Sequence, residues 1–344
     1  MKKEFLPVGK LPQVLLERLL QEYVTTDKQV LVGPSIGEDA TVIEFGNKYL
    51  VAKTDPITFV SKDSGWYAVN INANDIATMG AVPRWFLVTV LLPEGKSTGE
   101  YIEQIFENMS SACGELGISL CGGHTEITSN LDRTVIVGQM LGEVSKEKLV
   151  LSSGAKKGDD ILLTKGIAIE GTSIIAREKE SYLKERYKPA TIERMKEFTK
   201  VPGISVLKEA LLANSLPGIH AMHDPTEGGL SMGLYELAKA SKLGLEVKED
   251  KIRMLPETLE LCNEFKLNPL GLIASGSLLI ATAPEATDKV EKLLKDNKID
   301  VSAIGKVVDA RGVKLVRNKK VEKAVKRRKE TFPLFERDEI TKIL

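Results

Sequence analysis

Two spacings of apolar residues alternate along the chain, and they predict its strands and helices. Short runs rich in β-branched residues, such as QVLVG (29–33) and ATVIEF (40–45), predict strands. Apolar residues three or four positions apart predict helices at about 11–23 and 98–116. The segment 65–81 has the same helical spacing but consists mostly of small and apolar residues, which predicts a buried helix.

The pattern starts again after LSSGAKKGDD, where serine, glycine and charge indicate a domain boundary near residue 150. A chain of 344 residues can form two domains with separate cores. We therefore predict an α/β domain over 1–150 and an α+β domain over 151–330. Residues 331–344 are predicted as a charged tail. For the whole charged stretch 319–344, a solvated helix and a loose tail are favoured over a binding arm.

Composition narrows the class of protein. The 48 Lys and Arg residues balance 48 Asp and Glu residues, which argues against nucleic acid or an anionic membrane as a partner. No apolar run reaches the ~18 residues of a membrane span, and the N-terminus does not have the pattern of a signal peptide. The 3 cysteines lack metal-binding spacing and are expected to be small buried residues. A cytoplasmic location is therefore expected.

The segment HDPTEGGL (223–230) places acids, a hydroxyl and glycines at the start of a predicted amphipathic helix. Asp224 or Thr226 could cap this helix. Capping does not require Gly228 and Gly229, each of which weakens a helix by about 1 kcal/mol relative to alanine. Glycines expose backbone N–H groups, and helix N-termini bind anions. An anion or nucleotide site is therefore favoured over capping alone.

Further acids lie at predicted boundaries or in apolar surroundings. Asp39 in GEDA precedes a strand, Asp55 in TDP follows one, and Asp75 lies inside the apolar helix NANDIATMGA. An unpaired carboxylate would be costly at Asp75, so either a lysine or backbone donor pairs with it or it is kept for a cation. Together with Asp224, these acids favour the cation. Hard oxygen ligands without His–Cys pairs indicate Mg²⁺ that bridges phosphates.

A second glycine pair lies in CGGHTEIT, which is predicted as a strand that runs into a turn. By itself this is best explained as a plain turn. His124 could share a metal with His220 and His223, but their spacing gives that hypothesis little support. Neither GxxxxGK[ST] nor GxGxxG occurs, which argues against a P-loop or dinucleotide fold. An ATP site would have to be built from scattered acids and glycine turns.

Taken in order, GEDA, TDP, NANDIATMGA, GGHTE and HDPTEGGL resemble the motifs of the AIR synthase-related superfamily. This superfamily includes aminoimidazole ribonucleotide synthetase, thiamine-monophosphate kinase, selenophosphate synthetase and the hydrogenase maturation factor HypE, whose last motif is the most similar. The resemblance implies a two-domain subunit with ATP in a groove between the domains. It also implies a homodimer in which the N-terminal domains form a barrel-like core.

The resemblance also implies roles for individual residues. Asp39, Asp55 and Asp75 would hold Mg²⁺ and the phosphates, and Asp224 and His124 would be the catalytic residues. The residues implied to bind the nucleotide are Lys10, Asn74, Gly122, Gly123, Thr125, Thr226, Gly228 and Gly229.

The chain differs from these relatives in the residues that would handle the second substrate, the one other than ATP. It ends in DEITKIL with no cysteine after Cys262, whereas HypE ends in a cysteine that carries a carbamoyl group. No cysteine precedes Cys113, although selenophosphate synthetase is expected to have an early reactive one. We therefore expect phosphoryl transfer from ATP to an oxygen of an unidentified small molecule, with a maturation protein as an additional partner. A nucleotide-binding scaffold with little turnover is the alternative. A dehydrogenase is nearly excluded because the dinucleotide fingerprint is absent.

Overall fold

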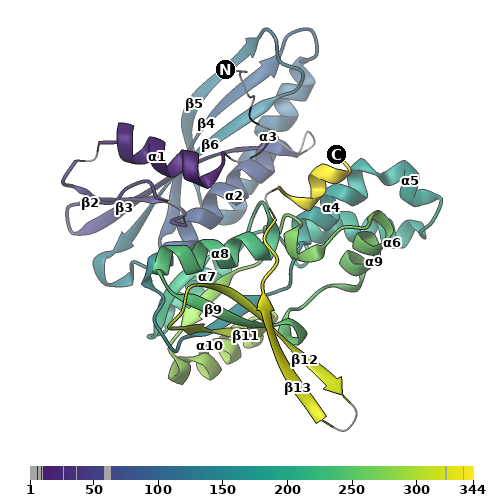
Figure 1. Ribbon diagram of the computed structural model, residues 1–344. Helices are drawn as coiled ribbons and strands as arrows, with labels where there is room; N and C mark the ends of the chain where they lie inside the picture. Colours follow the sequence, from purple (N-terminus) through teal and green to yellow (C-terminus); the bar gives the residue numbers. More distant parts are fainter. Residues whose placement is uncertain are drawn as a thin grey trace, which may run out of the picture.

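The computed structural model describes Leu6, Gly9 and residues 11–25, 27–35, 37–57, 63–321, 324–335 and 337–344. Two mixed sheets, one from each half of the chain, are covered by helices (Figure 1). The strand order of the N-terminal sheet is β1-β2-β3-β6-β4-β5. Its elements are α1 Gln13–Tyr23, β1 Val30–Val32, β2 Thr41–Phe45, β3 Lys48–Ile57, α2 Ser64–Thr78, β4 Val82–Pro93, α3 Gly99–Leu116, β5 Ser119–Thr128 and β6 Val135–Ser145.

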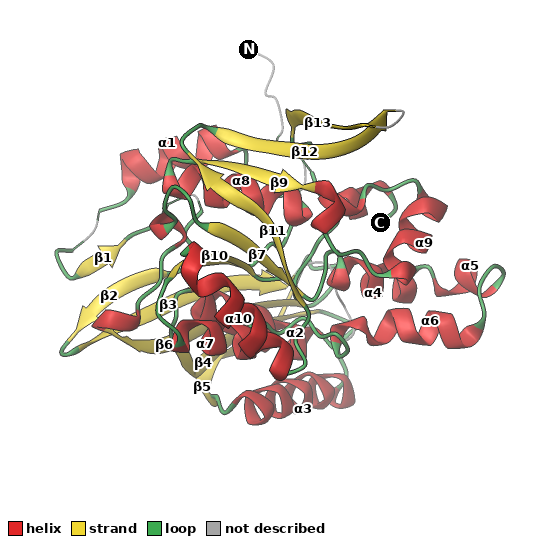
Figure 2. Cartoon of the chain, turned by 90° about the horizontal axis from the view of Figure 1, so that it is seen from below, coloured by secondary structure: helices red, strands yellow, loops and turns green. Residues whose placement is uncertain are grey.

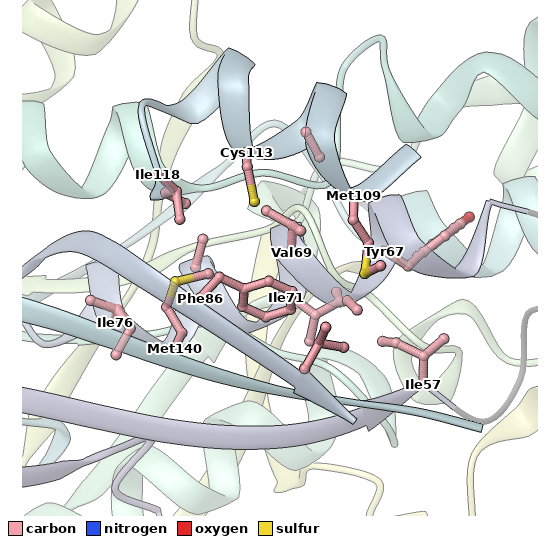
Figure 3. Close-up of a cluster of buried hydrophobic side chains, with 14 of the residues drawn as sticks. Ile57, Tyr67, Val69, Ile71, Ile76, Phe86, Met109, Cys113, Ile118 and Met140 are labelled. Atoms are coloured by element: carbon pink, nitrogen blue, oxygen red, sulfur yellow. The ribbon is translucent and has the colours of Figure 1, made fainter. Parts of the chain in front are cut away.

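Helix α2 is the centre of the N-terminal half, as its apolar sequence predicts. It packs against β3 and β6 on one side and against α3 and α7 (Leu207–Ser215) on others, so nearly every residue is buried. The sheet approaches the helix closely because β6 has glycine at the contact points. A Cβ at Gly142 would lie only 2.3 Å from Cγ2 of Ile76. Figure 3 shows the apolar side chains of this core, including Ile76, Phe86 and Met140.

The C-terminal sheet has the strand order β13-β12-β9-β11-β7-β10-β8, and helices lie on both of its faces (Figure 2). Its strands are β7 Asp160–Thr164, β8 Ile219–His223, β9 Gly244–Lys248, β10 Leu279–Thr282, β11 Val301–Val308, β12 Gly312–Val321 and β13 Ala324–Thr331. Its remaining helices are α4 Ile169–Glu178, α5 Glu180–Lys184, α6 Pro189–Lys196, α8 Gly229–Ser241, α9 Pro256–Phe265 and α10 Pro284–Asp296.

The predicted order of strands and helices agrees with the structure over most of the chain, and the two-domain α/β and α+β class is confirmed. The N-terminal sheet of a single chain is open, so the barrel-like dimer core stays a prediction. The domain boundary near residue 150 also stays a prediction, although β6 ends at Ser145 and β7 begins at Asp160. Strand β8 was not predicted, because its sequence IHAMH has two histidines and no β-branched run.

Two other predictions were wrong. The glycine pair of CGGHTEIT is not a turn but the middle of β5, where Gly123 has a φ of 145° and a Cβ would lie 1.8 Å from the carbonyl oxygen of Val88. The stretch 319–344 is not a solvated helix and a loose tail. It forms the end of the β12–β13 hairpin, and the residues after β13 return to the core, where Phe332 and Ile340 are buried. Apolar side chains within a charged stretch are enough to hold it there.

Two further observations bear on the expected environment. Cys113 and Cys262 are buried as expected, but Cys121 on β5 is exposed. In the described part of the chain, the helices are too short or too polar to cross a membrane.

Candidate functional site

Residues from both halves of the chain line one cavity of about 210 Å³. The N-terminal half contributes Asp39, Asp55 and Asp75, and the C-terminal half contributes Asp224 and Thr226. These residues are up to nearly 190 positions apart in the sequence, yet they share this one space, as the motif analysis predicts. The walls are carboxylate-rich, so the cavity suits cationic ligands or groups that reach it together with a cation.

Carboxylate oxygens of Asp39, Asp75 and Asp224 all lie within 4.8 Å of one another. Asp39 lies just before β2, Asp75 is in the last turn of α2, and Asp224 follows the end of β8. Both carboxylate oxygens of Asp224 are buried and have no hydrogen-bond partner among the described residues. Burial and the neighbouring carboxylates of Asp75 and Asp39 raise the pKa of Asp224 well above its usual value. A divalent cation bound by oxygen ligands would satisfy these groups, so the residues fit Mg²⁺.

Lys53 on β3 is the cation of this cluster, and the motif analysis missed it. Its Nζ lies 3.3 Å from Oδ2 of Asp75 and 3.9 Å from Oδ2 of Asp55. Burial alone would lower the pKa of Lys53, but these carboxylates raise it above its usual value. Burial raises the pKa of Asp75 to about 8 even though Lys53 opposes this shift. Asp75 therefore has the lysine partner that was one of its two alternatives, and its role toward a cation stays a prediction, which its place in the carboxylate trio keeps open. Residues 53 and 55 share one face of the strand, and this alternation was the signal in the sequence that could have placed Lys53 beside Asp55.

His223, the last residue of β8, connects Asp39 to helix α8. Its Nδ1 lies 2.8 Å from Oδ1 of Asp39, and its Nε2 lies 3.1 Å from Oε2 of Glu236. Burial alone would lower the pKa of His223, but Asp39 and Glu236 raise it well above its usual value. With a carboxylate at each ring nitrogen, the imidazolium donates from both and holds Asp39 toward the cavity.

The three histidines do not come together. His220 contacts Asp159 at 2.9 Å, and exposed His124 contacts Glu126 at 3.0 Å. Each histidine therefore has its own carboxylate partner, and the hypothesis of a shared histidine metal site is wrong.

One N–H at the helix start of HDPTEGGL has a partner that the sequence did not indicate, and the predicted nucleotide site there stays a prediction. Helix α8 begins at Gly229, and no side chain caps it from within the segment. Instead the N–H of Gly228 donates to Oδ2 of Asp338, at 2.7 Å, from the returning C-terminal tail. The anion at this helix start is thus the chain's own carboxylate. A Cβ at Gly229 would lie 2.7 Å from the carbonyl oxygens of Leu270 and Leu272, so this glycine allows close backbone packing.

The other predicted nucleotide-binding residues lie in different places. Asn74 is buried on α2, where its side chain bonds the backbone at Ile204 and Val206, each at 2.8 Å. Of the described residues that line the cavity, none comes from β5, which carries Gly122, Gly123, His124 and Thr125. Gly228 and Gly229 are likewise not among the described lining residues, and Lys10 lies outside the described residues.

Comparison with known proteins agrees with this geometry. The N-terminal domain of AIR synthase related proteins matches residues 37–144, and the C-terminal domain matches residues 156–318. The two matches cover more than half of the chain and include every carboxylate of the trio. The chain belongs to the AIR synthase related protein family.

Two curated relatives illustrate the range of this family. The carbamoyl dehydratase HypE of Rhizobium leguminosarum bv. viciae is 26% identical over 285 residues, which cover 79% of this AIR synthase related chain and 77% of the relative. The thiamine-monophosphate kinase of Aquifex aeolicus is 25% identical over 309 residues, which cover 86% and 93%.

Solved structures show that the fold is shared. A chain of the HypE–HypF complex superposes with a TM-score of 0.74 at 21% identity and covers 94% of this chain and 100% of its own length. HypE in complex with ATP superposes with a TM-score of 0.69 at 21% identity and covers 94% and 96%.

Glu170, in the first turn of α4, is another carboxylate that lines the cavity. The motif analysis missed it. It is buried, and its burial raises its pKa from an ordinary 4.5 to about 7. The sequence IAIEGTS offers a signal similar to that of Asp75, an acid between apolar residues at a helix start.

The raised pKa of Glu170 predicts how stability depends on pH. A carboxyl group whose pKa is higher in the folded state contributes stability below its unfolded value, and that stability is lost as the pH rises through the folded value. Glu170→Gln should therefore change little near pH 4.5 but stabilise the protein above pH 7, by on the order of 3 kcal/mol. Urea unfolding of both proteins across this pH range measures the effect. The prediction would be contradicted if the free energies of unfolding of the two proteins changed with pH in parallel.

Proposed function

We propose that this chain is a Mg²⁺- and ATP-dependent enzyme that transfers the terminal phosphoryl group to an oxygen of a small acceptor. The observation that carries the proposal is the convergence of Asp39, Asp75 and Asp224 within 4.8 Å in one cavity. Phosphoryl transfer needs little covalent help from the protein and depends on positioning and charge neutralisation. A trio of carboxylates without cysteine ligands is suited to hold the cation for that chemistry.

Each residue at this end of the cavity has a role in the proposal. Asp39, Asp75 and Asp224 hold Mg²⁺, which when bound neutralises phosphate charge. Asp55, which the resemblance implies as a metal ligand, lies outside the trio and beside Lys53, and the proposal places it on the phosphate-facing wall instead. Lys53 keeps the carboxylates from repelling one another, and His223 fixes the direction of Asp39. Asp224, with no other partner among the described residues, faces the transferred group.

The relatives support ATP as the phosphoryl donor. One is named as a kinase, and a solved structure of the same fold contains ATP. The structure of a HypE–HypF complex, together with a structure named as the hydrogenase maturation protein HypE, supports a maturation protein as an additional partner for this chain. The proposal leaves the acceptor open, because the relatives are named for different reactions.

The homodimer remains part of the proposal. Gly122, Gly123, His124 and Thr125 lie on β5 at the edge of the N-terminal sheet, where most residues are exposed. Within one chain these residues are not among the described residues of the cavity wall. Their predicted role near a nucleotide therefore requires a second subunit that pairs through this sheet.

Calorimetric titration of ATP with and without Mg²⁺ tests the proposal. We expect Mg²⁺ to strengthen ATP binding to the natural chain, and Asp75→Asn to weaken the Mg²⁺-dependent binding by at least about tenfold. If Asp75→Asn bound ATP in the presence of Mg²⁺ with unchanged affinity, the assignment of Asp75 as a metal ligand would be wrong. Phosphate release over a panel of small acceptors then separates the enzyme from the nucleotide-binding scaffold. Sustained turnover with any one acceptor excludes the scaffold.

A further inference from the structure

The β12–β13 hairpin carries the most one-sided charge of the chain, and the proposed phosphoryl transfer does not use it. Eight of the 13 residues in 317–329 are Lys or Arg, and Glu322 is the one acid. Because the whole chain has 48 residues of each sign, the rest of it has 40 basic and 47 acidic residues. The balanced total charge, which argued against nucleic acid as a partner, is therefore an average over an acidic body and a basic hairpin.

The outer part of this hairpin is a two-stranded ribbon. Strand β12 pairs with β9 over Gly312–Val316 and with β13 over Lys314–Val321. In Figure 1 the far ends of β12 and β13 extend away from the rest of the C-terminal half. At ~3.4 Å per residue, the paired residues of β12 that follow Val316 span about 17 Å. A partner can therefore reach this ribbon without contacting the cavity.

The register of the hairpin places like charges opposite each other. Arg317 is paired with Arg328. Two positions farther out, Lys319 is paired with Lys326, and alternation along the strands puts both pairs on the same face of the ribbon. Like charges directly opposite each other destabilise a sheet, and a two-stranded hairpin is only marginally stable on its own. This arrangement weakens the ribbon unless an anionic partner lies against it.

The base of the hairpin has the acids that its outer part lacks in sequence. Nε of Arg317 lies 2.8 Å from Oε2 of Glu249, and its Nη1 lies 3.1 Å from Oε2 of Glu330. The chain's own acids therefore offset the basic charge next to the sheet. The segment 318–328 has six basic residues and a single acid, so the positive charge is concentrated toward the end of the ribbon.

The composition of the ribbon favours duplex DNA over other anionic partners. Residues 317–329 include no aromatic residue, and their apolar residues are Val321, Ala324 and Val325. Protein interfaces depend on aromatic anchors and are depleted in lysine, and single-stranded nucleic acids stack their bases on aromatic side chains. Lys and Arg alone are enough to bind a phosphate backbone. The major groove of B-form DNA admits a two-stranded ribbon, whereas that of an RNA duplex is too narrow.

We propose that the β12–β13 hairpin is a binding arm for double-stranded DNA, which it holds through the phosphate backbone without reading the base sequence. Lys319 and Lys326 are the pair on which the inference depends. It goes beyond the proposed function, because no described residue of the cavity wall comes from this hairpin. The residues after 318 also lie outside the match to the C-terminal family domain, so the arm is a feature of this chain.

The test measures fluorescence anisotropy of a labelled DNA duplex of mixed sequence as the full chain is added, without ATP. We expect binding whose affinity falls by about 100-fold between about 50 and 200 mM KCl, as neutralisation of about four phosphates requires. A second duplex of unrelated sequence should bind with the same affinity within about twofold, because phosphate contacts carry no sequence information.

Three variants that change the net charge by the same amount separate binding from stability. Lys326→Glu places an acid opposite Lys319, so its unfolding midpoint in urea should be no lower, yet its DNA affinity should fall by at least about tenfold. The double variant Lys319→Gln with Lys326→Gln should reduce the slope of log affinity against log salt by about two. The control is Lys289→Gln with Lys292→Gln, at exposed positions of α10, and it should bind DNA within about twofold of the natural chain.

Several outcomes would overturn the inference. These are no binding of the duplex at low salt, an equal loss in the α10 control, or unchanged affinity in Lys326→Glu. Preference for an RNA duplex, or equally effective competition by poly-L-glutamate or phosphatidylserine vesicles, would point to a different partner and would also reject it. Calorimetry with Mg²⁺–ATP should give the same affinity for all variants within about twofold. Failure of the natural chain to bind Mg²⁺–ATP would reject the proposed function and leave the DNA result as it is.

Discussion

Asp224→Asn is expected to lower phosphoryl transfer by at least about 100-fold, because it removes a preorganised charge at the reacting group. The same variant should be more stable than the natural chain when Mg²⁺ is removed. Both oxygens of Asp224 are buried without a hydrogen-bond partner among the described residues, beside Asp39 and Asp75. The asparagine cannot ionise, so the repulsion disappears, with a gain of about 1–3 kcal/mol.

The measurements are the rate of ATP consumption with Mg²⁺ and the free energy of unfolding in urea with a chelator. Because the pKa of Asp224 is raised in the folded protein, its stabilising protonated form is lost as the pH rises. The gain from Asp224→Asn should therefore be larger at neutral pH than in acid. Asp309→Asn, at an exposed ion pair with Lys157, is the control and should change neither quantity. An active or destabilised Asp224→Asn would contradict the assignment.

Lys53→Met is expected to destabilise the metal-free protein by about 3–5 kcal/mol, because it leaves buried carboxylates without their cation. Lys53 contacts Asp75 at 3.3 Å and Asp55 at 3.9 Å, and its side chain is largely buried. Added Mg²⁺ should restore much of the lost stability, since a cation bound to the trio supplies the missing charge. Urea unfolding with and without Mg²⁺ measures both effects.

Lys48→Met provides the matched control for this variant. Lys48 lies on the same strand and pairs with Glu143 at 2.8 Å, but it is largely exposed. Its loss should cost no more than about 1 kcal/mol and should not depend on Mg²⁺. Because Asp75 has a pKa of about 8, the loss in Lys53→Met should be greatest above that pH, where Asp75 is ionised. Equal effects of the two lysine variants would show that Lys53 is not the counter-charge of the trio.

The candidate site could be predicted in part because its acids lie in unusual sequence surroundings. Asp75 lies among apolar residues of a predicted helix, Asp39 just before a predicted strand and Asp224 at the start of a predicted helix, and each is anomalous by local rules. Lys53, Glu170 and His223 were missed as site residues for the opposite reason. A lysine or glutamate beside apolar residues is common on any amphipathic element, so the local signals at Lys53 and Glu170 are weak until their burial against other charges is known.

The helix start of α8 shows the limit of motif reasoning most clearly. HDPTEGGL indicated an anion site, and an anion is found there, but it is the carboxylate of Asp338 more than 100 residues further along the chain. The two glycines permit that packing. No local pattern could indicate which acid would occupy the position, since the tail's path depends on Phe332 and Ile340 finding the core.

The sequence by itself determined the alternation of strands and helices, the two-part organisation and the acids that belong together, because hydrophobic spacing and local burial costs are properties of neighbouring residues. Only the tertiary structure decided which partner each charge has. Lys53 beside Asp75, His223 between Asp39 and Glu236, and Glu170 without a partner at Oε2 among the described residues all depend on contacts between distant segments. Such contacts are set by how the sheets and helices pack, and electrostatic free energies in a buried site depend on that geometry.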